Sequence, residues 1–407
     1  MPIPLLSLAP WIRYCTYGLV LSLPISTGGI NVFSWLIAVL ALLSKEWWGT
    51  ATQLWRNPLA LSALILFFSM LMGIFWTEGS SYEAWAVLGR YKKLLLIPFL
   101  LPFFNQRAHQ RLALHLLLFS LSLTVLFSWT DFMGITHISD PIYYPAPPGD
   151  AVFRMHITQG LLFLLNIVVA MGLALTSVNR FQKIIYLFLA ALSAGDIIFV
   201  MVGRTGKALL PLLILWVIGE SVRIKMSGTW RYKKIPVWSA LAIIITLAGT
   251  AYFASKPDTM LGSIHQEVHE SHQTGAVTSQ GERVAFWTKG VTLFKQEPWF
   301  GHGTGSVITL TTQLARHSQR AVDQVVTFNL HNEYLMWAVQ LGVFGLIFIL
   351  GFFGLYLRAG LIAPDLNGLV LRGSWLIFAT GCLFNSFLID FTEGYSLVIL
   401  LGLLSKR

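Results

Sequence analysis

The sequence is poor in charged residues. Asp, Glu, Lys and Arg make up 11% of its 407 residues, whereas an ordinary soluble domain contains about 25%. Apolar residues (AVILMFWYC) account for 55%, and the mean hydropathy is +0.67. These values exclude a soluble globular enzyme and a disordered chain. They predict an all-α polytopic membrane protein.

Cysteine is almost absent. The two cysteines, Cys15 and Cys382, both lie in apolar runs. Two such residues exclude a disulfide-stabilised secreted scaffold, and their spacing gives no zinc-ligand pattern. We interpret both as small core residues.

Long apolar runs are plentiful, and a transmembrane helix needs about 20 mostly apolar residues. The candidate spans are 11–27, 29–43, 58–76, 84–104, 112–134, 158–176, 183–202, 206–219, 235–254, 332–357, 373–389 and 393–405. They predict about twelve transmembrane helices in a single membrane domain over residues 1–407.

Basic residues gather beside alternate ends of these runs. Arg107 and Arg111 fall on one side, whereas the short loops 77–83 and 390–392 carry carboxylates. Because cytoplasmic loops are enriched in Lys and Arg, we expect both termini in the cytoplasm. The 28 basic against 18 acidic residues (net charge +10) then reflect topology. No basic soluble face for nucleic acid is present.

Residues 255–331 form a long polar stretch that this topology places outside the cytoplasm. Connections of such length are usually functional. Near 281–294, Val284, Trp287 and Val291 recur at helical spacing, which predicts an amphipathic helix at the membrane interface. The segment 297–305 is rich in glycine, so it either presents backbone N–H groups to an anion or forms a tight turn after that helix.

Several polar residues on the predicted outer side can carry chemistry. Arg204 lies in a short turn between two apolar runs, and Arg283 begins the expected amphipathic helix. His331, at the mouth of the next span, is placed to act as a general base or to make an interfacial hydrogen bond. Asn332 follows it as a supporting candidate.

Two further positions are candidate substrate contacts. The run 94–104 is too short to span a membrane, so its helix must include Arg90 and Lys93. Cations held in a membrane are functional candidates, although snorkelling to headgroups also explains them. His156, near the outer start of another span, is either an acceptor or lipid contact or an interfacial packing residue.

No metal or other cofactor is predicted. His265, His269 and His272 would share a helix face as zinc ligands can. They lack the Glu of a His-Glu-x-x-His pattern, however, and their neighbours are Ser, Gln, Gly and Thr. The outer segments also lack an Asp-x-Asp pair for a divalent cation.

Taken in order, these motifs resemble one family. They are Arg204–Gly206, Arg283–Trp287, Pro298–Gly303 and His331–Leu335 with Gly342 and Gly345 downstream. The set is similar to that of the O-antigen ligase and polymerase superfamily of bacterial inner membranes. The length, the number of spans and the single large periplasmic loop resemble the ligase branch, whose members look like membrane-embedded glycosyltransferases of the GT-C type.

The resemblance implies an inverting, metal-independent glycosyltransferase of lipopolysaccharide biosynthesis. Its donor would be O-antigen on undecaprenyl pyrophosphate, its acceptor the lipid A-core oligosaccharide, and its site would face the periplasm. Arg204 and Arg283 would then stabilise the departing pyrophosphate, and His331 would accept or orient the acceptor proton. Arg90, Lys93, Asn332 and His156 would contact substrate. We expect the protein to be active as a monomer.

Three alternatives remain from the sequence. An O-antigen polymerase uses the same kind of donor with a second lipid-linked glycan as acceptor. A peptidoglycan glycosyltransferase of the shape–elongation–division type fits the loop and the His-Asn motif less well. A lipid-linked glycan transporter or flippase also places charges within a helix bundle, but the two halves show no paired broken helices.

Overall fold

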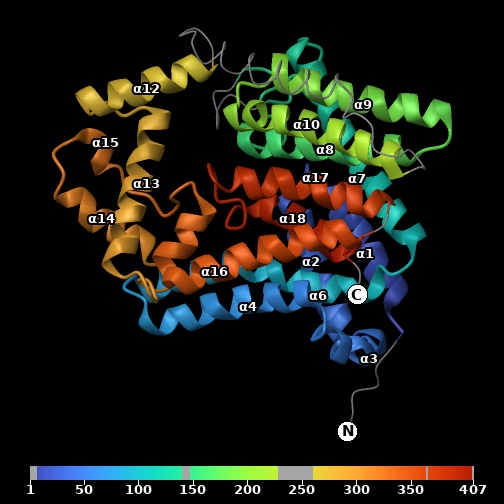
Figure 1. Cartoon of the computed structure of the whole chain (residues 1–407), viewed down its shortest axis with the longest axis horizontal. Coiled ribbons are helices and arrows are strands. Elements are labelled where there is room, and N and C mark those ends of the chain that lie inside the picture. Colours follow the sequence, from blue (N-terminus) through green and yellow to red (C-terminus); the bar gives the residue numbers. More distant parts are fainter. Residues whose placement is uncertain (1–6, 140–146, 228–259, 364, 406–407) are drawn as a thin grey trace.

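The computed structural model describes residues 7–139, 147–227, 260–363 and 365–405. The described part is helical, without strands, which agrees with the all-α class predicted for a polytopic membrane protein (Figure 1). The predicted span 235–254 and residues 255–259 of the long loop lie outside the described residues.

The N-terminal part consists of seven α-helices. They are α1 (Ala9–Ser22), α2 (Thr27–Leu43), α3 (Lys45–Leu54), α4 (Pro58–Met72), α5 (Ser81–Tyr91), α6 (Leu96–Leu100) and α7 (Arg107–Phe132). Local signals set several starts. Asn57 caps α4 by accepting from the N–H groups of Leu59 and Ala60, both at 3.0 Å. Ser80 and Glu83 form a capping box at α5.

The rest of the described chain contains ten further α-helices. They are α8 (His156–Thr176), α9 (Arg180–Phe199), α10 (Arg204–Ser227), α12 (Met260–Thr274), α13 (Ser279–Gln296), α14 (Val307–Arg316), α15 (Ala321–Gln324), α16 (Glu333–Ile362), α17 (Asp365–Gly381) and α18 (Phe391–Leu404).

Five of these elements are long and apolar enough to cross a membrane. They are Pro58–Trp76, Arg107–Phe132, His156–Thr176, Arg180–Phe199 and Glu333–Ile362, and α2 and α18 are shorter apolar helices. The protein therefore has the character of a multi-pass membrane protein. The count of twelve spans stays a prediction.

The single helix expected over 84–104 does not form. After α5 ends at Tyr91, the chain passes through a 3₁₀ helix at Lys92–Leu95, the short helix α6, and a second 3₁₀ helix at Leu101–Phe103. Pro98 and Pro102 lack the N–H group that a continuous α-helix requires. Lys93 is buried at this break, so it does not lie on one continuous helix face with Arg90.

α8 is the most buried of the five long apolar elements, and α9, α10, α17 and α7 pack around it. α16 packs beside α4 and α17. At one end of the bundle, α12–α15 form a separate group, on the left in Figure 1. α13 and α14 of this group contact α16. These helices form most of the long polar stretch, and they bring its residues to the ends of the membrane helices.

α13 contains the segment 281–294, but its faces differ from the expected ones. Val284 and Val291 are exposed on the surface, while Lys289 is buried. The Lys289 ammonium donates to the carbonyl oxygen of Val325 at 2.7 Å, which ties α13 to the segment after α15. The position of α13 at a membrane interface stays a prediction.

Candidate functional site

Arg204 is the first residue of α10, and its guanidinium forms a two-point ion pair with Glu267 of α12. The Nη1–Oε2 distance is 3.1 Å, and Nη2 donates to the other carboxylate oxygen. The hydrogen bonds from Arg204 lower the pKa of Glu267 and hold it as a carboxylate. The entry into α10 is fixed by Asp150, which accepts from the Val202 N–H group at 2.7 Å and more weakly from Gly203 at 3.4 Å.

Arg283 lies in the first turns of α13, close to this ion pair. Burial lowers the pKa of its guanidinium, the charge of Arg204 lowers it further, and Glu267 opposes both effects. Within the described chain, the Arg283 guanidinium has no hydrogen-bond or ion-pair partner. The one carboxylate of Glu267 thus lies near two guanidinium groups and pairs with that of Arg204, which leaves a net positive charge for an anion.

His331 lies near Arg283, whose charge acts on its ring. Its ring stacks on Phe286, with ring centroids 6.0 Å apart and planes 18° apart. Its backbone adopts a left-handed conformation with φ 51°, and its N–H group donates to Asn329 Oδ1 at 2.9 Å. Burial and the nearby Arg283 charge lower the pKa of His331 to about 4. The imidazole is therefore neutral at pH 7.

His156, the first residue of α8, also belongs to this group. Its charged neighbours are Asp150 and Arg283. It packs against Gly203, where a Cβ atom would lie 3.2 Å from the His156 ring. The structure therefore gathers Arg204, His331 and His156 around Arg283, although these four residues come from four different helices or helix ends.

Asn332 and Glu333 fix the turn that carries His331. Asn332 caps α16 by accepting from the Leu335 N–H group at 3.0 Å, and its amide donates to the Leu383 carbonyl at 3.1 Å. Glu333 is fully buried and accepts four hydrogen bonds. Its donors are Tyr91 Oη at 2.8 Å, Trp337 Nε1 at 3.0 Å, Leu388 N at 2.9 Å and Ile389 N at 3.4 Å. The His331 turn is thus anchored to α5 and to the chain before α18.

Arg90 and Lys93 contact different partners. The exposed Arg90 guanidinium lies 4.6 Å from the ring centre of Phe328. The buried Lys93 ammonium donates to the carbonyl oxygen of Asp390 and lies 5.7 Å from the ring centre of Tyr395. Lys93 therefore helps to hold the start of α18, and only Arg90 faces the long loop.

The glycine-rich turn at 301–305 does not present its N–H groups to an anion, because the protein uses them. The N–H groups of His302 and Gly303 donate to the carbonyls of Val339 and Gln340, each at 2.9 Å, and Gly305 N donates to Gln340 Oε1 at 2.8 Å. A Cβ atom at Gly303 would lie 2.3 Å from Thr77 Cα. The glycines allow the turn to pack between α16 and the segment after α4.

Gly342 completes this packing. Its φ of 64° and ψ of −150° interrupt α16, and a Cβ atom there would lie 2.2 Å from the Trp299 carbonyl oxygen. Gly342 thus serves contact with the glycine-rich turn rather than with another membrane helix.

Within the described residues, the histidines of α12 do not form a metal centre. His265 and His269 stack with ring centroids 6.1 Å apart. No group of three or more His, Cys, Asp and Glu side chains suited to a metal ion occurs among the described residues.

Glu267 and Glu333 are two polar residues of this region that the sequence did not single out. Glu267 pairs with an arginine far away in the chain, and no local pattern marks such a partner. Glu333 carries a visible signal, because an acidic residue directly after His331-Asn332 enters an apolar helix. A carboxylate in that position needs buried hydrogen-bond donors.

Residues 188–350 match the family model described as O-antigen ligase. The match supports membership of the O-antigen ligase and polymerase superfamily, as the motifs predict. The matched region of this O-antigen ligase family model covers about two fifths of the chain and includes Arg204, Arg283 and His331, but not Arg90, Lys93 or His156. No curated protein matches the sequence. The family match supports a ligase- or polymerase-type function in lipopolysaccharide biosynthesis, with lipid-linked polysaccharide substrates.

Proposed function

We propose that the protein is an inverting, metal-independent glycosyltransferase that transfers O-antigen from undecaprenyl pyrophosphate to the lipid A-core oligosaccharide. It would act as a monomer in the bacterial inner membrane, with its site facing the periplasm. The observation that carries this proposal is the position of Arg283, whose charge acts on Arg204, Glu267, His156 and His331.

The two arginines are suited to the leaving group. As the bond from the anomeric carbon to the pyrophosphate oxygen breaks, negative charge develops on the phosphate. Arginine stabilises such charge with planar, paired N–H donors. Arg204 already uses this geometry with Glu267, and Arg283 has no such partner among the described residues. We assign the first phosphate contact to Arg283, with Arg204 as the second cation.

His331 is suited to the acceptor. Its neutral ring can take the proton of the sugar hydroxyl while that oxygen forms the new bond to the anomeric carbon. A pKa of about 4 makes the free imidazole a weak base. An anionic donor beside Arg283 would offset the arginine charge and raise the pKa of His331. Donor binding would therefore prepare the base.

The remaining candidates are assigned supporting contacts. His156 lies against Gly203 beside the cations and would contact the donor or acceptor. Asn332 would act through the cap that positions His331. Arg90 is exposed and would meet the phosphate or the lipid, and Lys93 would hold the adjoining start of α18.

The test is transfer by purified protein reconstituted with a defined lipid-linked donor in EDTA. One reaction receives purified lipid A-core and a second receives only further lipid-linked glycan. Product with lipid A-core supports the ligase, and product only in the second reaction identifies a polymerase. Absence of any product from folded protein would favour the transporter. Product that forms without EDTA but not with it would contradict metal independence.

A matched pair of variants ties the reaction to the site. Arg283→Gln removes a cation beside His331, whereas Arg320→Gln removes an exposed cation of the same loop that pairs with Asp323. We expect Arg283→Gln to lose transfer and Arg320→Gln to keep it. Equal rates in both variants would contradict the assignment of Arg283.

A further inference from the structure

A cavity of about 590 Å³ lies at the end of the bundle opposite the candidate site. Two helices connect these ends. α8 begins with His156 at the site and ends at Thr176 on the cavity wall, and α10 runs from Arg204 at the site to Arg223 on the wall. At 1.5 Å per residue, the stretch of α10 between the two arginines is about 28 Å long. That length is close to the thickness of a bilayer hydrocarbon core.

The wall of this cavity carries more positive than negative charge. It is lined by Arg107, Arg111, Leu175, Thr176, Arg223, Ile224, Ala363, Asp365, Leu366, Asn367 and Leu369. Three arginines thus face a single carboxylate. Among the described residues, the direct side-chain contact of that carboxylate is a 3.7 Å approach to Arg107, in which both side chains are more than 70% exposed. Such a contact neutralises little charge.

Arg111 is free to bind a ligand. It lies four residues after Arg107 on α7, so the two share a helix face. Its guanidinium has no ion pair or hydrogen bond within the described part of the chain. Its backbone carbonyl oxygen accepts a hydrogen bond from His115 Nδ1 at 2.7 Å, which does not involve the side chain.

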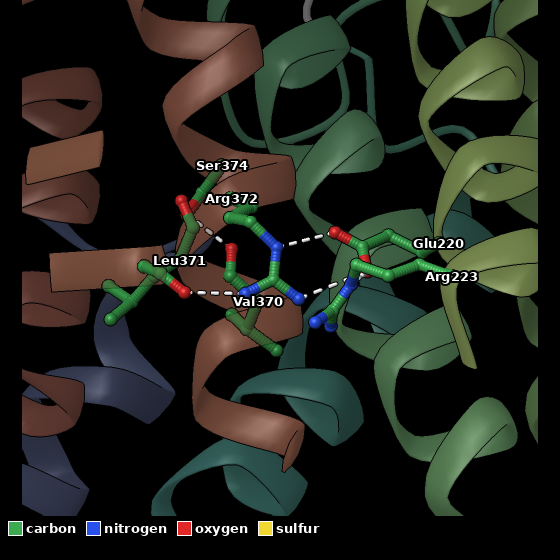
Figure 2. A network of polar contacts seen from close by, with 7 residues as sticks. Glu220, Arg223, Val370, Leu371, Arg372 and Ser374 are labelled. Carbon is green, nitrogen blue, oxygen red and sulfur yellow. Dashed lines mark hydrogen bonds and ion pairs between the residues drawn. The ribbon is translucent and has the colours of Figure 1, made fainter. Parts of the chain in front are cut away.

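Arg223 contacts Glu220 at 2.6 Å, but this one carboxylate does not neutralise the local positive charge. The same carboxylate already receives two hydrogen bonds from the buried Arg372, at 2.5 Å and 3.0 Å. Figure 2 shows both arginines meeting at Glu220. Arg372 also donates to the Gly360 carbonyl at 2.5 Å, which fixes it inside the bundle. One carboxylate between two arginines leaves a net charge of about +1 beside the cavity.

Beside the charged residues and the polar Thr176 and Asn367, the wall carries the apolar side chains of Leu175, Ile224, Leu366 and Leu369. A free inorganic anion would gain nothing from these side chains. A lipid would place its phosphate among the arginines and the first part of its acyl chains against the leucines. Basic pockets between membrane helices are known to suit anionic headgroups.

We propose that this cavity binds the phosphate of an anionic phospholipid through Arg107, Arg111 and Arg223. The site is separate from the proposed transfer site and does not depend on its chemistry. The lipid would join α7, α8, α10 and α17 at this end of the bundle, since each of these helices contributes to the wall.

The test is native mass spectrometry of the full chain with titrated phosphatidylglycerol, phosphatidylcholine or sn-glycerol 3-phosphate. The variants are the double substitution Arg107→Gln with Arg111→Gln, and Arg180→Gln as control. Arg180 is an exposed cation at the same end of the bundle but does not line the cavity. Monodispersity and the basal unfolding temperature establish that each variant is folded. Arg111→Lys replaces the double variant if that one does not fold.

We expect wild type and Arg180→Gln to bind one phosphatidylglycerol in preference to phosphatidylcholine. The double variant should bind it at least about tenfold more weakly, because it removes two of the three guanidinium groups that would contact the phosphate. Arg111→Lys should weaken binding less, because it keeps the charge and loses only the paired donors. Equal affinity in all variants, or an equal loss in Arg180→Gln, would overturn the proposal in favour of general basic surface charge. Binding of glycerol phosphate with the same variant dependence would confirm the phosphate site but assign it to a soluble ligand.

Discussion

His331 stacks on Phe286, and Arg283 lies one helical turn before Phe286 on α13. One helix therefore sets both the plane of the imidazole and the cation that lowers the pKa of His331. α13 is in turn held by Trp287, whose indole N–H donates to the His331 carbonyl at 3.4 Å. The proposed base and the proposed phosphate contact are thus fixed to one another.

Phe286→Ala should lower kcat by about tenfold and leave the donor KM nearly unchanged, because it removes the ring that orients His331 but no contact to phosphate. Steady-state transfer rates measure this split. Val284→Ala, on the exposed side of the same helix, should keep wild-type kinetics. A loss of the same size in both variants would show that α13 matters only for folding.

Arg204→Lys and Arg283→Lys should each reduce transfer by roughly 10²-fold or more, since an ammonium cannot reproduce the two-point contact of a guanidinium. Rates in detergent or proteoliposomes are the readout. Arg320→Lys is the control, because Arg320 is exposed and pairs with Asp323. Wild-type rates in either site variant would reject a role for that arginine at the leaving group.

The pH profile should follow the lowered pKa of His331. With a pKa of about 4, the free imidazole stays neutral as pH falls from 7.5 to 5.5, so kcat/KM should change little over that range. An ordinary histidine, with a pKa of about 6.5, would lose most of its neutral form. Arg283→Gln removes a cation that lowers this pKa, so an NMR titration of the His331 ring in this variant should show its pKa moved to higher pH. A move to lower pH would contradict the account.

Gly342→Ala should destabilise the protein. The left-handed backbone alone costs a non-glycine residue about 1–3 kcal/mol, and the new Cβ would collide with the Trp299 carbonyl. Thermal unfolding in detergent measures the effect. Gly351 lies in the same helix with nothing within 4 Å of its Cβ position, so Gly351→Ala should unfold at the wild-type temperature. If Gly342→Ala unfolds at the same temperature as Gly351→Ala, the glycine-rich turn can move away from α16 without loss of stability, which would contradict this prediction.

Apolar length predicted many helix limits well. The expected spans 29–43 and 158–176 correspond to α2 (Thr27–Leu43) and α8 (His156–Thr176). The prediction of one continuous helix over 84–104 was wrong. Mean hydropathy counts Pro98 and Pro102 as ordinary residues of an apolar run and does not account for their missing N–H groups. Mean hydropathy did not predict the helices of the long polar stretch. These helices bury only the faces that pack against one another and against α16, so they form no long apolar run.

Residue chemistry predicted the members of the candidate site better than their partners. Arg204, Arg283 and His331 were marked by charge and position. Glu267 was not, because an ion pair between α10 and α12 depends on how the chain folds back. The glycines at 301–305 were ambiguous, since glycine serves both anion binding and close backbone approach. The hydrogen bonds of the turn's own N–H groups and the close contacts at Gly303 and Gly342 decide for close approach.

The most direct test of the proposed site is the paired measurement of donor binding and transfer by His331→Ala. The account predicts that transfer to lipid A-core falls by about 10²–10⁴-fold, while the lipid-linked donor still binds through Arg204 and Arg283. Transfer at the wild-type rate by His331→Ala would contradict the account.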